Sequence, residues 1–216
     1  MAVVASPNNP TGLSMPREQI LNLARILAAR GCRLMVDESF VEFSRAGRAQ
    51  SVEDAIETHP NLVVIKSMSK VFGIAGLRLG YLLSADRAFI ERVRDTLPIW
   101  NVNGLAEEFL RMVGRYLPAF VRSCDLTRES CRKLEADLSA LPGLHPIKSD
   151  ANFILCRLAD GAADGAEVPR RLYVAHNILI KDCSSKIMPG AHRYVRIAAR
   201  TPAENRRLVS ALASVL

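Results

Sequence analysis

The chain has 216 residues, of which 49% are hydrophobic and 24% are charged, a composition typical of a soluble globular protein with one sizeable core or two small ones. Its formal net charge is +7, yet no basic stretch is interleaved with aromatic residues, which argues against nucleic-acid binding and leaves small anionic substrates as the expected partners. No apolar run is long enough to cross a bilayer and the first residues show no secretion signal, so we expect a cytoplasmic protein without a membrane span. Five cysteines without a CxxC pair and four histidines without metal-ligand spacing indicate reduced, buried thiols and no metal site.

In the N-terminal half, apolar β-branched runs alternate with stretches of helical periodicity. This alternation predicts an α/β fold with a mainly parallel sheet, in which functional loops follow the carboxyl ends of the strands. Ser14 and Pro16 are typical of the start of the first helix, and Gly31 of its end. The expected elements are a strand at 3–6, a helix to 31, a strand at 34–36, a helix-rich stretch to 60, and strands at 62–66 and 79–83.

The C-terminal half predicts a helical bridge and then a small α+β domain. Thr201, Pro202 and Glu204 have the pattern of a capping box at the start of the last helix. Four leucines of the bridge form an expected core-facing stripe: Leu126, Leu134, Leu138 and Leu141. The expected elements are helices at 86–97 and 104–141, a strand at 153–156, a flexible loop at 159–165, a helix at 168–176, and strands at 178–180 and 194–197.

The strand at 62–66 leads into a group of polar residues that could carry chemistry. Ser67, Ser69 and Lys70 follow the strand, and Arg78 follows a glycine-rich turn. A lysine held beside hydroxyl groups suits Schiff-base chemistry on an aldehyde, and an arginine fork suits phosphate. The alternative is a surface lysine that merely follows a strand.

Three other positions are weaker candidates on their own. Asp37 ends a buried strand and could hold a heterocyclic nitrogen protonated, although an aspartate at a turn is common. Asn9 lies in a cluster of turn formers and could donate a hydrogen bond to a cofactor, or simply form the turn. Lys181 and Arg196 lie on successive predicted strands and could hold anionic substrate groups, or be solvated.

Taken together in chain order, these residues resemble a known pattern. The series Asn9, Asp37, Ser67-x-x-Lys70, Arg78 and Arg196 resembles the class I/II aminotransferase superfamily of fold type I pyridoxal-phosphate enzymes. The resemblance implies that Lys70 forms the Schiff base with the cofactor. The other implied roles are Asp37 on the pyridine nitrogen, Asn9 on the ring hydroxyl, Ser67, Ser69 and Arg78 on the cofactor phosphate, and Arg196 on the substrate carboxylate.

Further runs are similar to the branch that holds threonine-phosphate decarboxylase, an enzyme of cobalamin side-chain synthesis, and histidinol-phosphate aminotransferase. These runs are 37–43, 100–103, 178–183 and 194–205, and the last two look most like the decarboxylase. Phe40 stands where many members have a tyrosine. Lys181 stands where the branch has an arginine that binds the substrate phosphate, and lysine lacks the bidentate fork.

The resemblance implies an enzyme that acts at Cα of a small, phosphorylated amino acid or amine, by decarboxylation or transamination, as a homodimer. It also implies that residues 1–103 are the C-terminal part of the large cofactor-binding domain and that 104–216 are the bridging helix and small domain. Family members have a substantial portion before the turn at 7–12, with further cofactor contacts. The alternative from another class is therefore a non-catalytic domain or subunit.

Overall fold

The structure, a computed structural model, describes residues 1–161 and 164–216. Part of the predicted loop at 159–165 therefore lies outside the described residues. The chain packs as two units: residues 1–8 with 14–124 form unit 1, and residues 9–13 with 125–216 form unit 2. The predicted domain boundary between residues 103 and 104 stays a prediction. Within the described ranges, no helix has the length and apolarity needed to cross a membrane.

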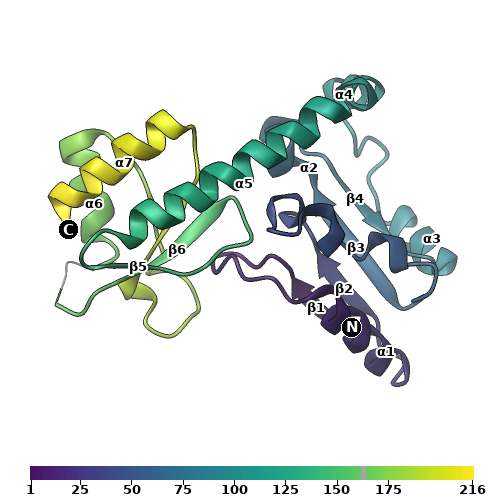
Figure 1. The fold of residues 1–216 in the computed structure, drawn as a ribbon. Helices are drawn as coiled ribbons and strands as arrows, with labels where there is room; N and C mark the ends of the chain where they lie inside the picture. Colours follow the sequence, from purple (N-terminus) through teal and green to yellow (C-terminus); the bar gives the residue numbers. More distant parts are fainter. Residues whose placement is uncertain (162–163) are drawn as a thin grey trace. The chain divides into compact units, whose positions relative to one another are not determined.

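Unit 1 is built on a four-stranded sheet with the order β1-β2-β3-β4. β1, β2 and β3 are parallel, and β4 runs antiparallel to β3. The register pairs Asp37 of β2 with Ile65 of β3, so both strands end at the same edge of the sheet (Figure 1). The strands are β1 (Ala2–Ala5), β2 (Leu34–Asp37), β3 (Leu62–Ser67) and β4 (Gly80–Leu83).

Helix α1 (Arg17–Ala28) covers one face of this sheet. Its Ile20 and Ala24 are buried against the strand residues Leu34, Val36 and Leu62, which confirms the predicted amphipathic helix. The predicted cap was wrong: Pro16 takes the extended N-cap conformation itself, so the helix begins at Arg17.

The stretch between β2 and β3 differs from its prediction. Instead of α-helix it contains three short 3₁₀ turns, η1 (Val41–Phe43), η2 (Gly47–Gln50) and η3 (Glu53–Ala55). Gly47 has a φ of 59°, and the hydroxyl of Ser44 donates to its carbonyl at 3.1 Å. A left-handed residue and a side chain bonded to the backbone both interrupt a continuing helix.

The rest of unit 1 is helical apart from β4. Asp86 and Asn103 cap α3 and α4 by accepting backbone N–H groups. The elements are α2 (Met68–Val71), η4 (Ala75–Leu77), α3 (Arg87–Asp95), α4 (Gly104–Val113), η5 (Gly114–Tyr116) and the first residues of α5 (Leu117–Ser139).

Unit 2 contains an antiparallel sheet with the order β5-β6-β8-β7. Its core joins Leu134 and Leu138 of α5 to Ile154, Leu172 and Leu212. The elements are β5 (Leu144–Pro146), β6 (Phe153–Leu158), α6 (Glu167–His176), β7 (Lys181–Asp182), η6 (Ala191–Arg193), β8 (Tyr194–Ala198) and α7 (Pro202–Val215).

Two predictions for unit 2 were wrong and one was confirmed. Leu126 is 66% exposed and not in the core, because it falls off the face of α5 that carries Leu134 and Leu138. The strand expected at 178–180 instead covers Lys181–Asp182, since only these residues pair with β8. The capping box of α7 is present, with Thr201 and Glu204 exchanging hydrogen bonds.

Candidate functional site

The carboxyl ends of β2 and β3 bring Asp37, Ser39 and Ser67 together. Ser39 donates its backbone N–H and its hydroxyl to Oδ1 of Asp37, at 2.9 and 2.5 Å. The same hydroxyl accepts the backbone N–H of Ser67 at 3.0 Å. In the part of the chain that the structure describes, no group bonds to Oδ2 of the half-buried Asp37. One carboxylate oxygen is thus fixed and the other is available.

Lys70 lies on α2, one turn beyond the end of β3, and is exposed. The sequence placed this lysine directly at a strand end in a pocket, but the strand ends at Ser67 and the chain turns into a helix. Nζ of Lys70 donates to Oγ of Ser67 at 3.3 Å and lies 5.9 Å from the centroid of the Phe40 ring. Its amine is therefore accessible and close to the strand-end group.

Arg78 is positioned by the return of the chain into β4. It has a φ of 58°, and one guanidinium nitrogen donates to the carbonyl of Ala75 at 3.0 Å. The neighbouring Leu79 accepts the backbone N–H of Met68 at 3.1 Å, which keeps this segment beside the start of α2. Arg78 is exposed, whereas Ser69 is only 7% exposed, so Arg78 and Ser67 are the more accessible anion donors.

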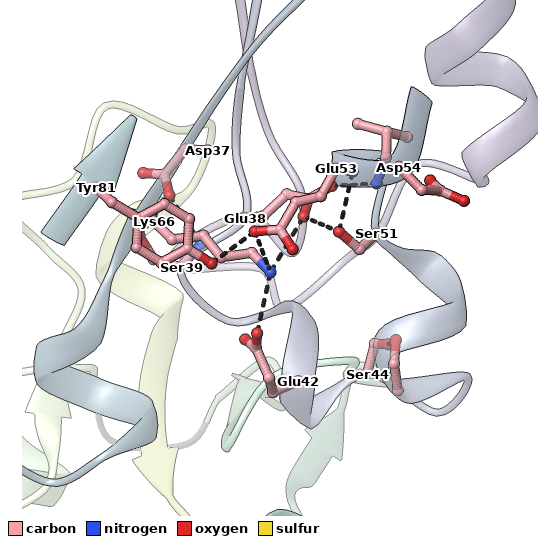
Figure 2. A network of polar contacts seen from close by, with 12 residues as sticks. Asp37, Glu38, Ser39, Glu42, Ser44, Ser51, Glu53, Asp54, Lys66 and Tyr81 are labelled. Atoms are coloured by element: carbon pink, nitrogen blue, oxygen red, sulfur yellow. Dashed lines mark hydrogen bonds and ion pairs between the residues drawn. The ribbon is translucent and has the colours of Figure 1, made fainter. Parts of the chain in front are cut away.

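A buried polar network lies next to these residues. Lys66, the penultimate residue of β3, is 6% exposed. Its Nζ lies 3.0 Å from Glu42, 3.0 Å from Glu53 and 3.5 Å from Glu38. Figure 2 shows the carboxylates converging on this ammonium group, while the Asp37 carboxylate lies apart from them.

The network is completed by hydroxyl and backbone donors. Glu38 is 1% exposed and accepts the hydroxyl of Ser51 at 2.5 Å and the backbone N–H of Val52 at 2.7 Å. The hydroxyl of Tyr81 donates to Glu53 at 2.6 Å. Residues from β3, β4 and the 3₁₀ turns are thus tied together directly behind Asp37 and Ser39.

Burial and pairing shift the pKa values in this network. Burial raises the pKa of Glu38, against the lowering effect of its hydrogen bonds to Ser51 and Val52. Burial alone would lower the pKa of Lys66, but attraction to Glu42 and Glu38 outweighs it and raises that pKa above 10.5. Tyr81 is 39% exposed, and its partial burial, with the bond to Glu53, raises the pKa of its phenol. Lys66 is therefore held as a cation and Tyr81 as a neutral phenol.

Sequence reasoning missed Ser39 and the Lys66 network. Lys66 directly follows the apolar run 62–65, and a charged residue at the end of a buried strand was a signal for a buried ion pair, although the sequence does not show which acidic residues pair with it. Nothing in the sequence marked Ser39 as a functional residue except its position two residues after the end of β2.

In unit 2, Asn9, Lys181 and Arg196 form a second group. Lys181 of β7 and Arg196 of β8 are register partners, so both side chains lie on the same face of the sheet. Arg196 donates to Oδ1 of Asn9 at 2.6 Å, and its guanidinium lies 4.8 Å from the centroid of the Phe153 ring. The bond leaves the Asn9 amide nitrogen to donate elsewhere. The predicted residues thus form one group in each unit: Asp37, Ser67, Ser69, Lys70 and Arg78, and Asn9, Lys181 and Arg196.

A comparison with models of known families assigns the chain to a family. The model of the family "Aminotransferase class I and II" matches residues 1–212. The chain belongs to the class I and II aminotransferase family. The predicted resemblance is therefore confirmed.

Curated relatives within this aminotransferase family have different reactions. A CMP-5'-(3-aminopropyl)phosphonate synthase of Streptomyces rubellomurinus is 40% identical over all of this chain, which covers 34% of that protein. A histidinol-phosphate aminotransferase of Desulfitobacterium hafniense is 33% identical over all of the chain and 56% of that protein. An L-serine phosphate decarboxylase of Sulfurospirillum multivorans is 33% identical over 99% of the chain and 55% of that protein. The chain thus spans between a third and just over half of these relatives.

Solved aminotransferase-family structures have the same fold. A decarboxylase from Sulfurospirillum multivorans matches with a TM-score of 0.88 and 30% identity, over 99% of this chain and 61% of that one. An L-threonine-O-3-phosphate decarboxylase from Porphyromonas gingivalis matches with a TM-score of 0.85 and 29% identity, over 99% and 64%. A histidinol-phosphate aminotransferase from Sinorhizobium meliloti in complex with pyridoxal-5'-phosphate matches with a TM-score of 0.78 and 25% identity, over 99% and 56%.

Pyridoxal phosphate is the cofactor of this aminotransferase family, and the residues present fit it. Lys70 offers an exposed amine beside a hydroxyl, and Asp37 offers a carboxylate oxygen without a partner among the described residues. The Ser67 hydroxyl and the exposed Arg78 guanidinium can donate to a phosphate. The donor set is therefore an amine, an acid and anion donors, as an aldehyde-bearing pyridine phosphate requires.

Proposed function

We propose that this protein is a pyridoxal-phosphate-dependent enzyme that acts at Cα of a small, phosphorylated amino acid or amine, with threonine-phosphate decarboxylation as the preferred reaction. The observation that carries the proposal is the strand-end group, in which Ser39 joins Asp37 to Ser67 and Ser67 bonds to Lys70. Relatives that decarboxylate serine phosphate and threonine phosphate support the choice of reaction.

When bound, pyridoxal phosphate supplies an electron sink for the bond that breaks at Cα. In this proposal Lys70 would hold the cofactor through its amine and would take or return a proton at Cα of the substrate. Asp37 presents Oδ2 to the ring nitrogen and keeps that nitrogen protonated.

The remaining candidates bind anions or orient the cofactor. Ser67 and Arg78 donate to the cofactor phosphate, and the more deeply buried Ser69 is a weaker donor. The Asn9 amide nitrogen donates to the ring hydroxyl, because its oxygen is held by Arg196. Arg196 and Lys181, side by side on one sheet face, bind the substrate carboxylate and phosphate.

Two alternatives remain open. A histidinol-phosphate-type aminotransferase would use the same residues but remove the Cα proton in place of the carboxylate. A non-catalytic domain or subunit would keep the fold without binding the cofactor, and the partial coverage of the curated relatives motivates this reading.

The first experiment asks whether Lys70 takes the cofactor. The protein is incubated with pyridoxal phosphate, reduced with borohydride and digested, and the labelled peptide is identified by mass spectrometry. We expect a phosphopyridoxyl group on Lys70, no label there in Lys70→Ala, and unchanged labelling of Lys70 in the exposed-site control Lys133→Ala. No label on Lys70 in the wild type would favour the non-catalytic reading.

The second experiment separates the two reactions. Threonine phosphate is supplied with cofactor, and carbon dioxide release is followed beside amino transfer from glutamate to a keto acid. We expect release of carbon dioxide. Amino transfer without release of carbon dioxide would contradict the proposed decarboxylation and support the aminotransferase alternative.

We also propose a homodimer in the cytoplasm. Strongly exposed apolar side chains support the homodimer: Ile99 is 94% and Trp100 is 92% exposed, and such residues usually mark a covered surface when they are contiguous.

A further inference from the structure

We propose that Ser39 is a positioning residue, whose hydroxyl fixes the Asp37 carboxylate against the end of β3 so that its free oxygen meets the cofactor ring. The inference rests on the proposed function and adds a residue to it. Ser39 is not one of the residues that the sequence suggested. Ser39 is 8% exposed, so its hydroxyl is largely shielded from bulk water.

The Ser39 hydroxyl lies at the point where the backbone hydrogen bonds between β2 and β3 end. The last ladder contact is the backbone bond from Glu38 N–H to the Ile65 carbonyl, at 2.9 Å. The next donor along β3, the N–H of Ser67, finds Oγ of Ser39 at 3.0 Å in place of a strand carbonyl. A buried backbone N–H without an acceptor is costly, so the side chain completes the sheet edge.

The Ser39 hydroxyl also donates a hydrogen bond to the Asp37 carboxylate. Its bond to Oδ1 is 2.5 Å, in the range of charge-assisted hydrogen bonds. The backbone N–H of Ser39 also bonds to Oδ1, at 2.9 Å. With both donors on one oxygen, the carboxylate is held in one rotamer and Oδ2 is directed away from Ser39.

Glu38, which lies between Asp37 and Ser39 in the sequence, points to the opposite side of the backbone and is held there. Glu38 lies in the buried Lys66 network, bonded to Ser51 and Val52. Figure 2 shows Asp37 and Ser39 at the margin of this network. The backbone of 37–39 is thus fixed by Glu38, and the Ser39 hydroxyl sets only the position of the Asp37 side chain and of Ser67.

The test compares Ser39→Ala with Ser44→Ala in the whole chain. Ser44 is also buried, at 1% exposed, and its hydroxyl is also hydrogen-bonded, but to the carbonyl of Gly47 outside the strand-end group. Two quantities are measured: the exchange rate of the Ser67 amide proton without cofactor, and the dissociation constant of pyridoxal phosphate. Losing one hydrogen bond to a charged group predicts a rise of about tenfold in that constant.

We expect Ser39→Ala to speed Ser67 amide exchange and weaken cofactor binding, Ser39→Thr to restore both, and Ser44→Ala to leave both unchanged. Equal values in wild type and Ser39→Ala, with Lys70 still labelled, would overturn the inference and leave the proposed function standing. A wild-type chain that takes no label on Lys70 contradicts the proposed function. In that case the Ser67 exchange rate still decides whether Ser39 bridges the two strands.

Discussion

Lys66 holds the buried side of the strand-end group in place. Its ammonium contacts Glu38, Glu42 and Glu53 at 3.0–3.5 Å, and removing one member of a buried ion pair leaves an uncompensated charge. We expect Lys66→Met to lower the free energy of unfolding by about 3–5 kcal/mol in urea denaturation near neutral pH. The control Lys133→Met, at an exposed lysine paired with Asp137, should change it by less than about 0.5 kcal/mol. Similar losses in both variants would show that the Lys66 network adds little to stability.

The raised pKa values of Tyr81 and Lys66 predict how the unfolding free energy changes at alkaline pH. Both have a raised pKa in the folded chain, from ordinary values of 10.0 and 10.5. The unfolded chain therefore loses these protons first, so the stabilisation is complete below pH 10 and declines as the pH rises above it. We expect the unfolding free energy to fall as the pH rises above about 10, and to fall less steeply in Tyr81→Phe. An unchanged slope in Tyr81→Phe, matching the more exposed control Tyr173→Phe, would contradict the role of Tyr81.

At the residue scale, the sequence predicted those site residues whose position depends on their neighbours in the chain. Asp37 and Ser67 were predicted at the ends of two strands, and the structure places them there, on strands that pair with each other. Ser39 was missed because its hydroxyl bonds to Ser67, 28 residues away. The partners of Lys66 were missed because its three glutamates lie 13 to 28 residues away in the sequence.

At the scale of single elements, the start of α7 makes a clear prediction. Thr201 and Glu204 exchange hydrogen bonds in a capping box. We expect Thr201→Ala to destabilise the chain by about 1 kcal/mol, because a helix N–H loses its acceptor. The control is Thr96→Ala, whose hydroxyl, among the described residues, bonds only to the Val93 carbonyl at an exposed helix end. Equal effects would mean that the cap contributes nothing beyond the loss of a hydroxyl group.

The elements also show which signals can be read from sequence. Capping boxes and amphipathic helices arise from residues within a few positions. The buried face of α1 and the capping box of α7 were therefore predicted, whereas the cap of α1 was not. The edge strand β7 was misplaced by a few residues, because its limits depend on which backbone groups reach β8. The stretch of η1 to η3 was expected to be α-helical, because the sequence did not show the left-handed Gly47 or the Ser44–Gly47 bond that interrupts a helix there.

At the scale of the whole molecule, the exposed apolar residues of unit 1 predict self-association. Trp100 is the chain's single tryptophan and is 92% exposed, so its fluorescence reports directly on whether this surface is covered. We expect its emission to move to shorter wavelength as protein concentration rises, with a matching change in sedimentation.

The contact can be located by two matched variants. Ile99→Asp should abolish the shift, because it places a charge beside Trp100, whereas Ile187→Asp alters an equally exposed isoleucine in unit 2 and should leave it. Emission independent of concentration in the wild type, with a monomer in sedimentation, would contradict the proposed homodimer.

Unit 2 includes a short stretch from near the start of the chain, Asn9–Leu13. The Gly12 carbonyl accepts the backbone N–H of Asp150 at 2.8 Å, and a Cβ on Gly12, whose φ is 71°, would collide with Ser149. During synthesis on the ribosome, this stretch emerges more than a hundred residues before the strands it joins. A gene fragment that begins at Asp125 therefore encodes an incomplete unit, and its missing piece, which also carries the Asn9 partner of Arg196, would have to be supplied as a separate peptide.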